Sequence, residues 1–237
     1  MDDECAGVFA ALDAAYAGGW SGLQRWCRDA PASLRARHER MRVHPPPLAL
    51  EVDGAIVAEL DVRLGRGNNS DVYLTRDGRI LKVARVASAA RTLLLQAWTA
   101  PLLRAHGIAA AEVSEIDRDG LFLVQARVPG PSVRDAWRQE STLTPALRAR
   151  LLGEVRRLRA FGLATGLWID LRDRDVFVRR DGSLVHVDYG PRVHMDGSTT
   201  YAYLDAAGER RFHDDEEALA RFFGRAPSVA ASAAGFA

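Results

Sequence analysis

Residues 64–85 read LGRGNNSDVYLTRDGRILKVAR, and this stretch decides how the rest of the chain is interpreted. Glycine and small polar residues gather in its first part, between two apolar runs. Its last part places Lys82, the only lysine of the chain, inside an apolar segment with the pattern of a strand. Arginine serves equally well on a surface, so a lone lysine here indicates a position where a compact ammonium is required. A surface lysine without a role is the alternative.

Composition describes an ordinary globular protein. The 237 residues are 48% hydrophobic and 27% charged, with a formal net charge of +1, which gives no support for wholesale nucleic-acid binding. No apolar run reaches the roughly 18 residues of a membrane span. Cys5 and Cys27 are too few for a disulfide framework, and the acidic start does not resemble a basic secretory signal. We therefore expect a cytoplasmic location, with secretion as an effector left open.

Proline and glycine divide the first part of the chain. Spacing and composition predict short helices at Glu4–Tyr16 and Ser33–Met41. The run Pro45-Pro46-Pro47 then stops any helix, because proline lacks the amide donor. We expect residues 1–47 to form an N-terminal helical appendage with a proline-rich linker.

A β-rich region is predicted for residues 48–130. Asp53-Gly54 and Asp77-Gly78 each separate two apolar runs, which is a strong hairpin signal. Residues 87–106 have the pattern of one long helix that ends before Gly107. Residues 113–128 have the pattern of a third hairpin.

The second half, residues 131–227, is predicted to be mainly helical. Leucine and valine recur at helical spacing over Pro145–Phe161, and a short helix is expected at Asp214–Phe223. Residues 176–190 form a further predicted hairpin, and residues 228–237 a loose tail. The fold class is therefore α+β.

A glycine-rich turn, a strand lysine, one long helix and then an acidic hairpin make the chain resemble the protein kinase-like superfamily. The likeness covers roughly residues 50–190. The chain resembles a small, divergent bacterial member of this superfamily. It is more similar to aminoglycoside phosphotransferases, lipopolysaccharide core kinases and minimal kinase-fold effectors than to full-size eukaryotic kinases. The resemblance implies a two-lobed fold with a β-rich N-lobe and a reduced helical C-lobe.

The resemblance assigns the glycine-rich loop to residues 65–70. Gly65 and Gly67 match two of the family's glycines, and a third is missing. Asn68, Asn69 and Ser70 offer amide and turn chemistry in its place. These residues would cover the phosphates of ATP, because backbone amides approach a phosphate closely only where side chains are small. A polar hairpin turn without such a role explains the stretch almost equally well.

By the same resemblance, Lys82 would hold the α- and β-phosphates, and backbone groups of Ala126 and Val128 would meet adenine. Asp170 resembles the catalytic aspartate that orients the acceptor hydroxyl. Asp175 stands where the family has asparagine. Together with Asp188 of the Asp-Tyr-Gly motif it would bind Mg²⁺ or Mn²⁺. The alternative is that these aspartates are surface residues that flank a hairpin and have no role in a site.

Several residues depart from the family pattern. Trp168 stands where the family has histidine, and Gln96 where it has the glutamate that pairs with the strand lysine. A Lys82–Gln96 contact would therefore be a hydrogen bond to a neutral group rather than an ion pair. No Ala-Pro-Glu motif is present.

The resemblance predicts an ATP-dependent phosphotransferase, a kinase that moves the γ-phosphate to a hydroxyl. Protein serine or threonine, an envelope sugar and a small molecule all stay open as acceptors. The departures leave a second interpretation, a pseudokinase that binds nucleotide or a partner protein as a scaffold. Retention of Lys82, Asp170 and Asp188 together favours the enzyme.

Replacing the lone lysine tests whether its shape matters. We expect Lys82→Arg to reduce phosphate transfer nearly as much as Lys82→Ala, because a planar guanidinium does not fit between two phosphates. Transfer of radiolabel from ATP measures the effect. Wild-type turnover in the arginine variant would make Lys82 an ordinary cation.

Overall fold

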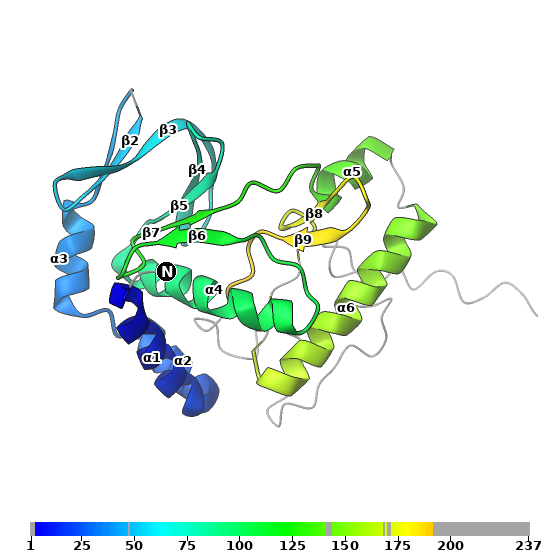
Figure 1. Cartoon of the computed structure of the whole chain (residues 1–237), viewed down its shortest axis with the longest axis horizontal. Coiled ribbons are helices and arrows are strands. Elements are labelled where there is room, and N and C mark those ends of the chain that lie inside the picture. Colours follow the sequence, from blue (N-terminus) through cyan, green and yellow to red (C-terminus); the bar gives the residue numbers. More distant parts are fainter. Residues whose placement is uncertain (1–2, 47, 141–143, 168, 170–171, 192–237) are drawn as a thin grey trace, which may run out of the picture.

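The computed structural model describes residues 3–46, 48–140, 144–167, 169 and 172–191. Within these ranges the chain is a mixed α+β structure (Figure 1). A seven-stranded antiparallel sheet has the order β1-β2-β3-β4-β5-β7-β6. Its strands are β1 (Arg42–His44), β2 (Ala49–Val52), β3 (Ala55–Arg66), β4 (Ser70–Thr75), β5 (Ile80–Ala84), β6 (Val113–Ile116) and β7 (Phe122–Gln125). A separate hairpin joins β8 (Val176–Val178) and β9 (Leu184–His186).

The predicted hairpins are confirmed. Val52 pairs with Ala55 across the Asp53-Gly54 turn, where both turn residues have positive φ, 52° and 83°. That conformation matches the twist of the flanking strands and explains the Asp-Gly pair. The turn at Asp77-Gly78 joins β4 to β5, and β6 pairs with β7 as expected.

Helix α4 (Ala87–Ala105) is the centre of the molecule, and Figure 1 shows it lying along the sheet. It confirms the predicted long helix and ends before Gly107, whose φ is +71°. Leu93 and Ala97 pack against the sheet, whereas Leu94 and Leu103 belong to a second apolar cluster behind the helix. A helix buried on nearly all sides has to be apolar on nearly all sides, and α4 is.

The N-terminal segment contains more structure than the sequence predicts. Helices α1 (Asp3–Ala17) and α3 (Ala32–Arg40) confirm the two expected helices, but α2 (Gly19–Arg28) and strand β1 were not predicted. Glycine and serine in α2 weaken its helical signal. Gly22 is nevertheless required, because a Cβ there would lie 2.2 Å from the Ala15 carbonyl oxygen of α1.

Residues of this segment share the core with the rest of the chain. Leu12 and Leu23 are buried in the cluster behind α4. The hydroxyl of Tyr16 donates to the Thr165 carbonyl at 2.6 Å. Arg37 of α3 pairs with Asp117 at 2.7 Å, in the turn between β6 and β7. The first helices are therefore packed on the long helix and bonded to the β6–β7 turn and to the end of α6.

The second half contributes helices α5 (Val133–Glu140) and α6 (Pro145–Thr165) and the β8–β9 hairpin. Helix α6 extends four residues beyond the predicted Phe161 and ends at Gly166, whose φ is +70°. The predicted helix at 214–223 and the tail lie outside the described residues. None of the described helices combines the length and apolarity that crossing a bilayer requires.

A leucine on the first helix tests whether the N-terminal segment belongs to the core. Leu12→Ala should lower the free energy of unfolding by about 2–5 kcal/mol, because the side chain is fully buried. Leu163→Ala is the matched control, since Leu163 is 58% exposed, and it should change stability by less than about 0.5 kcal/mol. Urea denaturation measures both. Equal effects would contradict a shared core.

Candidate functional site

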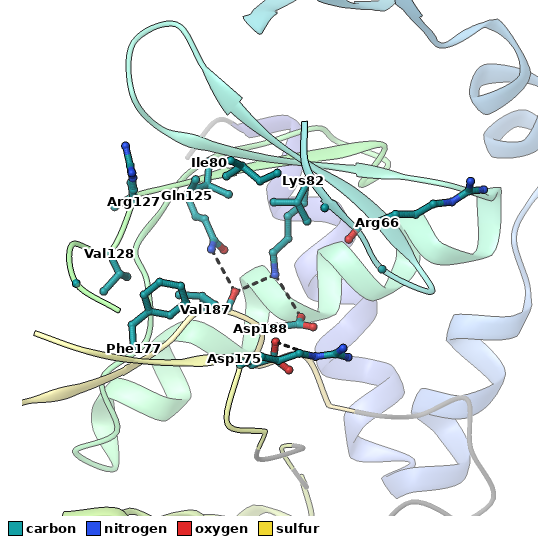
Figure 2. A pocket seen from close by; sticks show the side chains of 18 of the residues that line it. Arg66, Ile80, Lys82, Gln125, Arg127, Val128, Asp175, Phe177, Val187 and Asp188 are labelled. Atoms are coloured by element: carbon teal, nitrogen blue, oxygen red, sulfur yellow. Dashed lines mark hydrogen bonds and ion pairs between the residues drawn. The ribbon is translucent and has the colours of Figure 1, made fainter. Parts of the chain in front are cut away.

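A cleft of about 910 Å³ opens between the β3–β4 turn, strand β5, the segment after β7 and the β8–β9 hairpin (Figure 2). Most residues that the sequence predicted for a site line this cleft: Gly65, Gly67, Asn68, Ser70, Lys82, Ala126, Val128, Asp175 and Asp188. Asn69 lines an adjoining hollow of about 240 Å³. Asp170 lies outside the described residues. The fold thus brings together side chains that are up to 123 positions apart in sequence (65 to 188).

The glycine-rich turn is held by backbone hydrogen bonds. The Gly67 N–H donates to the Ser70 carbonyl at 2.8 Å, and the Arg85 N–H donates to the Asn69 carbonyl at 3.0 Å. The Arg85 guanidinium also donates to the Gly67 carbonyl at 2.9 Å. The turn is therefore anchored to the end of β5, the strand that carries Lys82.

Lys82 is only 5% exposed, at the inner end of the cleft. Its ammonium donates to Gln96 Oε1 on α4 at 2.9 Å, to the Val187 carbonyl at 2.8 Å and to Asp188 Oδ1 at 3.2 Å. The predicted neutral hydrogen bond to Gln96 is confirmed. Because an ammonium has three donors, all three are satisfied.

Two glutamines extend the contacts of Lys82. Gln96 Nε2 donates to Gln125 Oε1 at 3.1 Å, and Gln125 Nε2 donates to the same Val187 carbonyl at 3.2 Å. Both glutamines are buried, at 2% and 1% exposure. Figure 2 shows Gln125 and Lys82 pointing toward Val187 from neighbouring strands. Buried amides are satisfied here by each other rather than by water.

Asp175 and Asp188 lie near each other because the Val187 N–H donates to the Asp175 carbonyl at 2.9 Å. Burial raises the pKa of Asp175 to about 6, and the negative charge of Asp188 contributes to that rise. Two hard oxygen ligands that repel each other suit a divalent cation. The described residues contain no group of three or more ligating side chains. Mg²⁺, which is commonly held by one or two carboxylates and a substrate phosphate, fits this donor set.

The segment after β7 borders the other end of the cleft. The Ala126 N–H donates to the Glu112 carbonyl at 2.8 Å. In the described part of the chain, the Ala126 carbonyl and the Val128 N–H have no hydrogen-bond partner. Ile80 and Phe177 line the same cleft. A flat heterocycle with its own donors and acceptors would fit such an apolar slot edged by free backbone groups.

Sequence reasoning missed Gln125 and Phe177 as lining residues. Gln125 ends the apolar run FLVQ, and a glutamine after three buried residues is a signal for a buried amide. Phe177 lies in a strand whose register alone gives no indication of what it faces. No protein-family model and no curated protein matches the chain.

Substitution by alanine should affect the free energy of unfolding differently at two glycines of the cleft. Gly130 has a φ of +116°, and a Cβ there would lie 2.2 Å from the Val178 carbonyl oxygen. Gly130→Ala should therefore lower the free energy of unfolding by at least about 2 kcal/mol. A Cβ at Gly65 meets no atom within 4 Å, so Gly65→Ala should keep or raise stability, by up to about 1 kcal/mol. Urea denaturation compares the two, and equal losses would contradict the described packing.

Proposed function

We propose that this chain is an ATP-dependent phosphotransferase of the protein kinase-like type, acting on a hydroxyl group. The observation that carries the proposal is the Lys82 ammonium, buried at the inner end of a cleft, in contact with Asp188 and beneath a glycine-rich turn. A nucleoside triphosphate is bound by a fixed cation, by carboxylates that hold its metal ion and by a turn without bulky side chains that covers its phosphates.

The order of elements around Lys82 supports the proposal. The sheet has the order β3-β4-β5-β7-β6, and the helix that follows the lysine strand carries Gln96, the lysine's partner. The superfamily resemblance of the sequence implies this arrangement: a turn between the first two strands, a lysine on the third and a helix with its partner after it. Adenine would meet the Ala126 carbonyl and the Val128 N–H, which have no hydrogen-bond partner among the residues that the structure describes.

The chemical roles follow from position and charge. Lys82 would bind the α- and β-phosphates by exchanging its longest contact, Asp188 Oδ1 at 3.2 Å, for phosphate oxygens, while Gln96 and the Val187 carbonyl keep the ammonium in place. Asp175 and Asp188 would hold Mg²⁺ or Mn²⁺, which supplies neutralisation of the phosphate charge. Asp170 would orient the acceptor hydroxyl and accept its proton. The acceptor stays open among protein serine or threonine, an envelope sugar and a small molecule.

A pseudokinase that binds nucleotide or a partner as a scaffold is the second candidate. The amide of Gln96 favours it, because the lysine has a neutral partner on α4. The two functions differ in one measurable property, since only the enzyme transfers the phosphate of ATP.

Two aspartate variants separate binding from transfer. Asp170→Asn should keep affinity for a non-hydrolysable ATP analogue within a few-fold while transfer falls about 10²-fold or more, because only the acceptor's base is lost. Asp188→Asn should lose both transfer and metal-dependent affinity. Calorimetric titration and transfer of radiolabel from ATP, with Mg²⁺ or Mn²⁺, report the two behaviours.

Asp181→Asn is the matched control, because Asp181 lies in the β8–β9 turn and, among the described residues, hydrogen bonds to Ser183 of the same turn. It should match the wild type in both assays. Wild-type protein that binds the analogue yet labels neither itself, water nor any lysate fraction would favour the scaffold. Failure of the wild type to bind ATP would overturn the enzyme and leave only a scaffold that binds a partner protein.

A further inference from the structure

We propose that Gln125 is a positioning residue for Lys82 and acts through Gln96. Four hydrogen bonds close a ring: Lys82 to Gln96, Gln96 to Gln125, Gln125 to the Val187 carbonyl, and Lys82 to that same carbonyl. Gln125 does not touch the ammonium. It helps to decide which end of the Gln96 amide faces the lysine, together with the Tyr189 hydroxyl, which donates to the Ala111 carbonyl and is hydrogen bonded to Gln96.

The direction of the ring follows from one fixed group. The Val187 carbonyl can only accept, so Gln125 must turn its Nε2 toward it, at 3.2 Å. Gln125 Oε1 then faces Gln96, which must offer its own Nε2, at 3.1 Å. Gln96 is left with its oxygen toward Lys82. Each amide therefore orients the next.

An amide at position 96 has to be oriented by a neighbouring group, whereas a carboxylate there does not. Both oxygens of a glutamate accept, so a glutamate at position 96 would attract the ammonium in either orientation. If the amide of Gln96 were rotated by 180°, its N–H groups would face the ammonium. One of the three N–H donors of Lys82 would then have no acceptor. Burial makes that costly, since the three side chains of the ring are at most 5% exposed and water has little access.

The ring connects four elements around the cleft. Lys82 lies on β5, Gln96 on α4 and Gln125 at the end of β7, and Val187 immediately follows β9. Gln125 directly precedes Ala126, where the proposed function puts adenine. The position of the ammonium is thus coupled to the strand that leads into the base-binding segment. The importance of this coupling for phosphate binding rests on the proposed function, but the ring itself does not.

The lone lysine makes the ring directly measurable. Lys82 carries the only ε-amine of the chain, so an amine-acylating reagent such as acetic anhydride labels one side chain besides the N-terminal amine. Peptide mass spectrometry separates the two labels, and the N-terminal amine serves as the internal reference. We expect Gln125→Met to raise the relative labelling rate of Lys82 by about tenfold, the factor for losing one hydrogen bond to a charged group.

A rescue distinguishes orientation from packing. The double variant Gln96→Glu with Gln125→Met should label at nearly the wild-type rate, because glutamate needs no orienting partner. Gln96→Met alone should label as fast as Gln125→Met or faster, since it removes the acceptor itself. Gln139→Met, on the exposed end of α5, is the matched control and should leave the rate unchanged.

The outcomes separate this inference from the proposed function. Wild-type labelling in Gln125→Met, or no rescue by Gln96→Glu, would overturn the ring, whatever the chain does with nucleotide. If Gln125→Met does not fold by circular dichroism, Gln125→Leu replaces it with the same expectation. Labelling of the wild type with Mg²⁺ and an ATP analogue tests the other proposal. Undiminished labelling there, alongside the expected pattern in the variants, would support the ring and count against ATP as the ligand.

Discussion

The buried ammonium of Lys82 is the constraint on which the site depends. Removing a charge from water is costly unless the lost hydrogen bonds are replaced, and here three acceptors from two different parts of the chain replace them. Satisfying this one group fixes the distance between β5, α4 and the segment after β9. Lys82 and Asp188 both line the cleft, so the contacts of this one cation hold its inner end in place.

Under the proposed function, the carboxylates around Lys82 would be distributed differently from the pattern of the protein kinase-like superfamily. Gln96 removes a negative charge from the helix, and Asp175 adds one beside Asp188, so the formal charge of the set is unchanged. Compared with that pattern, one negative charge would be absent from position 96 on α4 and one would be added at Asp175, which lines the cleft beside Asp188. Burial raises the pKa of Asp175, and the negative charge of Asp188 beside it raises that pKa further. A divalent cation would offset that negative charge, which fits the proposed use of Mg²⁺ or Mn²⁺.

Local sequence signals predicted the hairpins and the long helix because their causes are local. Asp53-Gly54 adopts the positive φ values that only such pairs tolerate, and Gly107 stops α4. The cleft position of Lys82 could be predicted because a lone lysine in an apolar strand is itself unusual. Helix α2 could not be predicted from the sequence, because it depends on a close contact with α1 at Gly22. The role of Gln125 depends on groups from α4 and beyond β9, which no short stretch of sequence contains.

The contact between the first and the last long helix has a consequence for synthesis. Tyr16 and Thr165 are hydrogen bonded although they are 149 positions apart. At about 5–20 residues per second, a ribosome makes that intervening stretch in about 7–30 s. Throughout this time the partner of Tyr16 does not yet exist. Helices α1 and α2 can pack on α4 before that, but the part of α1 that contacts the end of α6 stays uncovered until Thr165 has been made.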